Sequence, residues 1–229
     1  MKKFTLALLV FALASLAWAK DKDDTGPSDL ESATATVQHM TATAGDKGVP
    51  LEVMEGAKCV AVIPKLIKGA FIVGGEHGDG VATCRTANGW SAPAPFTVSG
   101  ISWGPQIGGK STDLMMFFMN DQGAKDLMAG HFKVGADASA VAGPVGRSGS
   151  AEGGWKAAIL TYSSAKGAFI GASLNGAELH QNDKATEKWY GKIVPFQEIL
   201  TGGAPMPNAQ ARTFVNAVAQ AKEAANARK

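Results

Sequence analysis

A five-residue sequence, Lys-Gly-Ala-Phe-Ile, occurs twice in this chain, at residues 68–72 and again at residues 166–170. An apolar run precedes each copy, and a glycine-containing turn sequence follows each, at His77–Gly80 and at Asn175–Gly176. Asn-Gly after an apolar run is a strong hairpin signal. Each copy therefore predicts a strand, a short connection, a strand, a tight turn and a strand. Because the separation of 98 residues is too long for a solenoid repeat, the pair predicts a duplicated β unit within one domain. The alternative is a chance match between common strand-entry sequences.

The stretch from Lys58 to His180 has the composition of a β-sheet, since glycine is dense and Val, Ile, Phe and Thr recur between frequent turn signals. Helical patterns flank it, at residues 28–43 and after Asp183. We expect an α+β fold with a strongly curved, mainly antiparallel sheet or partial barrel, packed by N- and C-terminal helices. A single domain is expected over residues 28–229, after a solvated leader at residues 20–27.

The first 19 residues have the pattern of a signal peptide. Lys2 and Lys3 precede an apolar run from Phe4 to Leu16, and Ala17-Trp18-Ala19 forms an A-x-A cleavage site. The apolar run is shorter than the roughly 20 residues that cross a bilayer. We therefore expect a cleaved signal peptide at residues 1–19 and an exported chain, periplasmic or secreted.

The charge balance argues against a nucleic-acid partner. The chain has 22 basic and 20 acidic residues, and removal of Lys2 and Lys3 with the signal peptide leaves 20 of each. A nucleic-acid-binding protein needs a basic surface to meet the phosphates. A neutral chain also has no long-range attraction to anionic membrane, although a local basic patch is compatible with this balance.

The two cysteines, Cys59 and Cys84, both lie in strand-like segments of the first β unit. An even number of cysteines in an oxidising compartment predicts a disulfide. Closing a loop of 25 residues contributes about 3.5 kcal/mol in the chain-entropy account. Two thiols are half of a tetrahedral ligand set and no histidine has ligand spacing, so no metal site is expected, and no cofactor either.

Two glycine-rich segments resemble catalytic motifs. Residues 104–111 match G-x-x-x-x-G-K-S, but a phosphate-binding loop needs a helix after it, and residues 113–119 form an apolar run typical of a buried strand. The segment Gly146 to Ser150 resembles a nucleophile elbow with serine in place of the last glycine. We expect a bent glycine-rich strand and no enzyme; a cryptic enzyme using either loop is the third hypothesis.

Lysines and aliphatic residues alternate in the connection of the first repeat, where Lys65 and Lys68 flank Leu66 and Ile67, and Lys166 opens the second copy. Such side chains can enter a lipid interface, with the aliphatic stems on apolar surface and the ammonium groups on phosphates. Ordinary solvated turn lysines are the alternative interpretation.

Several ordered motifs resemble the SYLF domain family. The opening of that domain is similar to Lys58–Pro64, Lys68–Gly75, Cys84–Arg85 and Gly89–Pro93. The likeness continues through residues 106–109, 112–114, 142–147 and 198–202 and covers roughly residues 30 to 215. The resemblance places the chain in a bacterial exported branch of the family.

The resemblance implies a binding function, since eukaryotic members are associated with phosphoinositide-rich membranes and actin regulation. Our leading hypothesis is a non-enzymatic envelope domain that binds anionic phospholipid or a membrane surface. Its candidate residues are Lys65, Lys68, Lys110, Arg147 and Lys166, provided that they gather on one face. The alternative is a structural or protein–protein interaction module of the envelope that uses an open sheet edge or the Trp90 to Pro95 rim.

Overall fold

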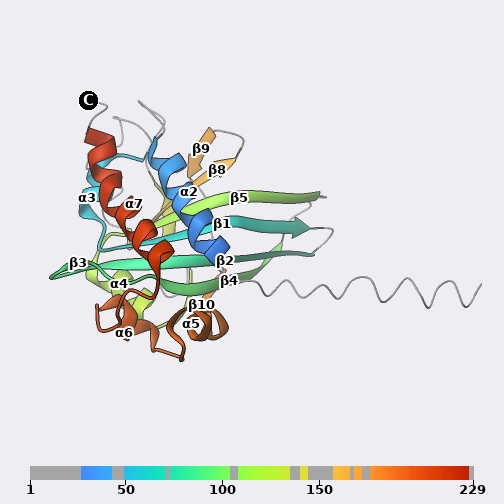
Figure 1. The fold of residues 1–229 in the computed structure, drawn as a ribbon. Helices are drawn as coiled ribbons and strands as arrows, with labels where there is room; N and C mark the ends of the chain where they lie inside the picture. The colour runs from blue at the N-terminus through green and yellow to red at the C-terminus, as the bar shows by residue number, and fades with distance from the viewer. Residues whose placement is uncertain are drawn as a thin grey trace, which may run out of the picture.

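The computed structural model describes residues 27–42, 49–70, 73–103, 108–134, 140–143, 157–165, 168–171 and 176–226 (Figure 1). The expected signal peptide at residues 1–19 lies outside these residues. Among the described residues, no helix is both long enough and apolar enough to cross a membrane.

One sheet joins all the strands in the order β6-β10-β4-β2-β1-β5-β8-β7, with β3 on β2 and β9 on β8. Every pairing is antiparallel except that of β7 with β8. The strands are β1 (Cys59–Ala70), β2 (Val73–Thr86), β3 (Gly89–Trp90), β4 (Ala94–Trp103), β5 (Gly108–Phe118), β6 (His131–Lys133), β7 (Ala140–Ala142), β8 (Ile159–Ala165), β9 (Ala168–Gly171) and β10 (Glu178–Gln181).

Helices precede, interrupt and follow the sheet: α2 (Pro27–Ala42), α3 (Leu51–Gly56), α4 (Asp121–Met128), α5 (Asp183–Tyr190), α6 (Phe196–Leu200) and α7 (Ala209–Asn226). Their ends carry local sequence signals. The Oδ1 of Asn120 accepts from the backbone N–H of Gly123 at 2.8 Å, which caps α4. Gly191 ends α5 with a left-handed φ of 72°.

The sheet curls into a half-barrel around an inner core. Phe132 on β6 and Ile159 on β8 lie near opposite edges of the sheet, yet they belong to one buried cluster that α4 and α6 also enter. Glycines on β2 permit the curl, because a Cβ on Gly78 would lie 2.8 Å from Cγ2 of Ile63. The predicted α+β fold with a strongly curved antiparallel sheet is confirmed.

A second core covers the outer face of the central strands. In Figure 1, α2 (blue) and α7 (red) cross this face together, and their side chains pack on β1, β2, β5 and β8. On β5, Met115 and Phe117 face these helices while Leu114 and Met116 face the inner core. Because successive side chains alternate between the faces, a continuous apolar run is required on a strand buried on both sides.

The two copies of the repeated sequence each fall at an antiparallel hairpin, β1–β2 and β8–β9. The strand bounds differ relative to the repeat: β1 ends at Ala70 and β2 begins at Val73, whereas β8 ends at Ala165 and β9 begins at Ala168. The prediction of a turn at His77–Gly80 is wrong, because β2 runs through these residues without a break. In the described residues β10 pairs with β4 and β6 rather than with β9, so the third strands of the two units are not equivalent.

The predicted disulfide is confirmed. Cys59 and Cys84 are register partners on β1 and β2, with Cα atoms 4.0 Å apart, and the bond lies fully buried in the inner core. It crosslinks the first hairpin at the end farthest from its turn.

Candidate functional site

Three of the five predicted cationic residues lie on two neighbouring strands. Lys65 and Lys68 belong to β1 and Lys110 to β5, and Lys110 is the direct register partner of Lys68. Arg147 and Lys166 lie outside the described residues. The structure therefore brings Lys65, Lys68 and Lys110 to one end of the sheet.

We call this end the sheet tip and define it as residues 65–70, 73–77, 99–103 and 108–112, from four adjacent strands. In Figure 1 these strand ends extend past α2 and α7. Ile67, His77 and Ser111 are exposed, which agrees with this arrangement, because α2 and α7 would bury these side chains if the helices covered the sheet tip.

A β-bulge at Lys65 separates the sheet tip from the rest of β1. Between the pairs Ile63–Leu114 and Leu66–Thr112, β1 has two residues where β5 has one. Lys65 adopts a φ of 61°, a left-handed conformation that is unfavourable for a residue with a Cβ. Its backbone N–H donates to Oδ1 of Asp113 at 3.2 Å, and its side chain is exposed.

The bulge decides which side chains of β1 face inward beyond it. Before the bulge, odd-numbered residues such as Ile63 enter the inner core; after it, Leu66 does. Alternation then places Ile67 on the outer face, where its side chain is 51% exposed, and Lys68 on the inner face. At the sheet tip Ile67 thus lies between Lys65 and Lys68 in sequence, but on the opposite face of the sheet from Lys68.

The ammonium group of Lys68 is not free. Its Nζ lies 2.7 Å from Oε2 of Glu76, the residue opposite it on β2. The Lys68 side chain is 36% exposed, whereas that of Glu76 is only 5% exposed. The ion pair therefore neutralises one of the three lysines at the sheet tip.

The segment that resembles a phosphate-binding loop is a strand where the structure describes it. Residues 108–111 open β5, which continues to Phe118, so a strand rather than a helix follows the lysine and serine of the motif. This agrees with the interpretation of a glycine-rich strand. Residues 104–107 and the elbow-like segment Gly146–Ser150 lie outside the described residues.

The rim from Trp90 to Pro95 is unsuitable as a docking surface. Trp90 is half-buried, and residues 91–95 are all buried. This part of the alternative interaction hypothesis is wrong, because the segment enters the core as the start of β4.

Sequence reasoning missed the role of Arg85. Its Nε donates to the carbonyl of Ala57 at 2.8 Å and an Nη donates to that of Met54 at 3.0 Å, while the guanidinium stacks 4.5 Å from the ring centre of Trp90. Partial burial lowers the pKa of Arg85, and the charge of Glu55 acts in the opposite direction. Arg85 thus anchors the end of α3 to β2, a structural role that depends on tertiary contacts.

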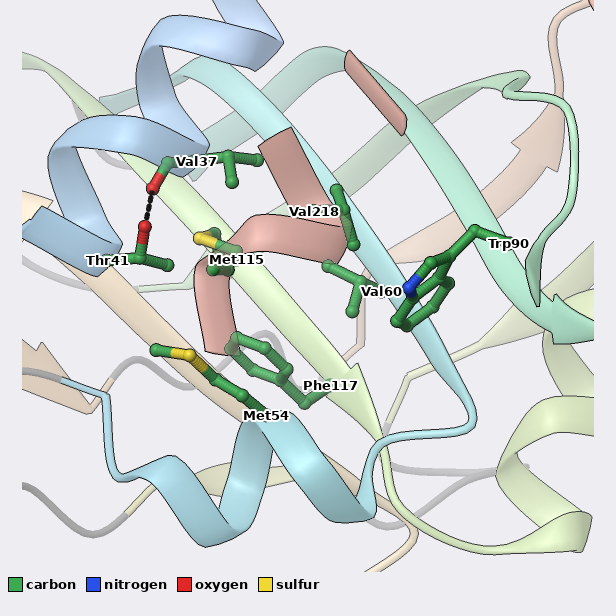
Figure 2. Close-up of a pocket in the computed structure, with 9 residues that line it drawn as sticks. Val37, Thr41, Met54, Val60, Trp90, Met115, Phe117 and Val218 are labelled. Carbon is green, nitrogen blue, oxygen red and sulfur yellow. Dashed lines mark hydrogen bonds between the residues drawn. The ribbon is translucent and has the colours of Figure 1, made fainter. Parts of the chain in front are cut away.

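A small apolar cavity lies between the outer face of the sheet and the helices (Figure 2). Its volume is about 10 Å³, about the space one water needs, and its lining includes Met54, Trp90 and Phe117. The one hydroxyl in the lining, that of Thr41, donates to the carbonyl of Val37 at 2.7 Å. The cavity is thus a packing gap rather than a catalytic pocket. No group of three or more possible metal ligands occurs in the described part of the chain.

Comparisons with known proteins show which sequences this chain resembles. The model of the Ysc84 family, described as "Las17-binding protein actin regulator", matches residues 99–221. LAS seventeen-binding protein 3 of Saccharomyces cerevisiae is 32% identical over 198 residues, which cover 80% of this chain and 43% of the relative. SH3 domain-containing YSC84-like protein 1 of Rattus norvegicus is 32% identical over 166 residues, or 71% of this chain and 48% of the relative. The chain thus spans less than half of these relatives' lengths, and no solved structure matches it.

Proposed function

Because the chain belongs to the Ysc84 (SYLF) family, we propose that it is a non-enzymatic binding domain whose sheet tip docks on anionic phospholipid surfaces. The observation that carries this proposal is that Lys65, Lys68 and Lys110 lie at the same end of the sheet as the exposed Ile67, beyond the helices, with Ile67 on the outer face and Lys68 on the inner face. A lysine near an anionic membrane contributes about 1 kcal/mol of attraction.

Ile67 adds an apolar contribution that is independent of charge. Its side chain is half exposed, and full burial of an isoleucine contributes about 1.5–3 kcal/mol, so insertion of the exposed part contributes about 1 kcal/mol. Lysines beside an apolar side chain suit the boundary between headgroups and acyl chains. The resulting contact is weak and sensitive to salt.

The setting of this function is part of the proposal. We propose that residues 1–19 direct export and that the domain works in the cell envelope, periplasmic or secreted. There an anionic phospholipid is the available ligand.

The test is co-sedimentation of the purified protein with neutral and anionic phospholipid vesicles at low and moderate salt. The double variant Lys65→Gln/Lys110→Gln is expected to bind anionic vesicles about 30-fold more weakly, from two lysines at about 1 kcal/mol each. The matched control is Lys125→Gln/Lys192→Gln, which removes two lysines from α4 and from the loop after α5. Equal losses in both double variants, or no binding by the unmodified protein, would refute docking through the sheet tip.

A protein partner is the second candidate, and one loop favours it. Ile193 is 58% exposed, yet its loop is held by Gln181, whose side chain donates to the carbonyl of Val194 at 2.8 Å and accepts from the N–H of Phe196 at 2.9 Å. The family description and the name of the Saccharomyces cerevisiae relative refer to binding of a protein, Las17. An Ile193→Ser variant that binds vesicles normally but loses a protein partner of the unmodified domain would favour this function.

A further inference from the structure

Glu76 is an unusual residue for a surface that is to meet phosphates. It is a buried acidic side chain at the sheet tip, on the inner face of β2, directly across from Lys68. An acidic group beside a binding lysine weakens the attraction of that lysine for an anion.

The packing around Glu76 holds its carboxylate in place. On the β4 side its register partner is Gly100, and a Cβ on that glycine would lie 3.0 Å from Oε1 of Glu76 and 3.0 Å from Cα of Ala177. The space that a side chain would take is therefore filled by the carboxylate and by the backbone before β10. With little room to move, Glu76 keeps its partner Lys68 on the inner face.

The sheet tip contains a row of register partners across four strands: Gly100 on β4, Glu76 on β2, Lys68 on β1 and Lys110 on β5. The row thus contains one acidic and two basic positions. Like charges directly opposite each other on neighbouring strands are unfavourable, and an acid beside one of them reduces the repulsion. In the row as it stands, Glu76 neutralises Lys68.

We propose that Glu76 is an internal counterion that withholds Lys68 from anionic surfaces and so sets how strongly the sheet tip attracts phosphates. This inference rests on the proposed function, and it identifies Glu76 as the residue that limits binding to anionic surfaces. A phosphate that takes the ammonium of Lys68 must leave the buried carboxylate of Glu76 without a partner, which is strongly unfavourable. Lys65 and Lys110 therefore act in the domain as it stands, and Lys68 acts only when a substitution removes the carboxylate of Glu76.

The decisive variant is Glu76→Gln, which keeps the shape and leaves an amide oxygen to accept from Lys68. It is expected to bind anionic vesicles about fivefold more tightly than the unmodified protein, with a steeper loss on added salt, because one more lysine takes part. Binding to neutral vesicles is expected to stay the same. The matched control is Glu178→Gln, which removes the same charge from the exposed ion pair of Glu178 with Lys133, 3.4 Å long.

A second variant tests the inference independently, in case Glu76→Gln alone does not fold. Lys68→Gln/Glu76→Gln removes both charges of the pair and is expected to bind anionic vesicles as tightly as the unmodified protein. Weaker binding by this double variant would mean that Lys68 already contacts phosphate, which overturns the inference.

The two proposals fail in different ways. If the unmodified protein binds anionic vesicles and Glu76→Gln binds no more tightly, or no more tightly than Glu178→Gln, the inference falls and the function of the sheet tip stands. If neither the unmodified protein nor Glu76→Gln binds, both fall.

Discussion

Replacement of Lys65 distinguishes the effect of its backbone conformation on stability from the effect of its ammonium group on vesicle binding. Lys65 holds a φ of 61° in β1, and a left-handed conformation costs a residue with a Cβ about 1–2 kcal/mol. Glycine avoids that steric cost but loses about 0.5–1 kcal/mol more in chain entropy on folding. We therefore expect Lys65→Gly to raise the free energy of unfolding by about 0.5–1 kcal/mol.

The matched variant is Lys65→Ala, which removes the same ammonium group but keeps a Cβ. Since the lysine side chain is exposed, its loss alone is expected to change the free energy of unfolding by less than about 0.5 kcal/mol. Thermal unfolding followed by circular dichroism measures the difference, expected to be about 1–4 °C in the midpoint for a domain of this size. Both variants are expected to lose the same affinity for anionic vesicles, about fivefold.

Two results would refute this reasoning. A Lys65→Gly variant no more stable than Lys65→Ala would show that the bulge conformation carries no strain. A difference in vesicle binding between the two variants would show that the backbone of the bulge, rather than the ammonium group, makes the contact.

Two further predictions concern the core. Gly80→Ala is expected to lower the free energy of unfolding by about 1–3 kcal/mol, because the added Cβ would lie 2.8 Å from Cε1 of Phe96. The control Gly75→Ala is expected to be nearly neutral, because the nearest atom to its added Cβ is 3.8 Å away. Denaturant unfolding of both variants measures the difference. Burial raises the pKa of both tyrosines, Tyr162 and Tyr190, so the folded protein keeps their protons where the unfolded chain loses them. The resulting stability is present below about pH 10 and is lost as the pH rises above it. Phenolate absorbance that rises near pH 10 while circular dichroism still shows the folded state would contradict this.

Local signals in the sequence predicted local structure well. The helical pattern at residues 28–43 correctly predicted a helix that packs on the sheet, since Leu30, Val37 and Met40 are all buried. The disulfide followed from the number of cysteines and their strand-like surroundings. Such features depend on residues close in the chain or on chemistry that leaves few alternatives.

Features that depend on register were not predictable in the same way. The sequence around Gly78 and Gly80 is typical of a turn. In the structure these positions require glycine because the curled sheet brings Leu66 and Phe96 so close that no room remains for a Cβ. The pairing of Lys68 with Glu76 requires knowledge of the bulge, since a shift of one residue moves every side chain to the other face. Pro64 was the available signal, because proline within a strand marks an edge or a bulge.

The association of α2 with α7 has a consequence for how the chain reaches its folded state. These helices come from opposite ends of the domain, and together they cover the outer face of the sheet (Figure 1). A growing chain can pair its central strands early, but the apolar residues on that face remain open to water until α7 emerges from the ribosome. Burial of the outer core is therefore a late event in biosynthesis. A chain that ends before Ala209 lacks α7, exposes the apolar outer face of the sheet and is expected to aggregate with other chains.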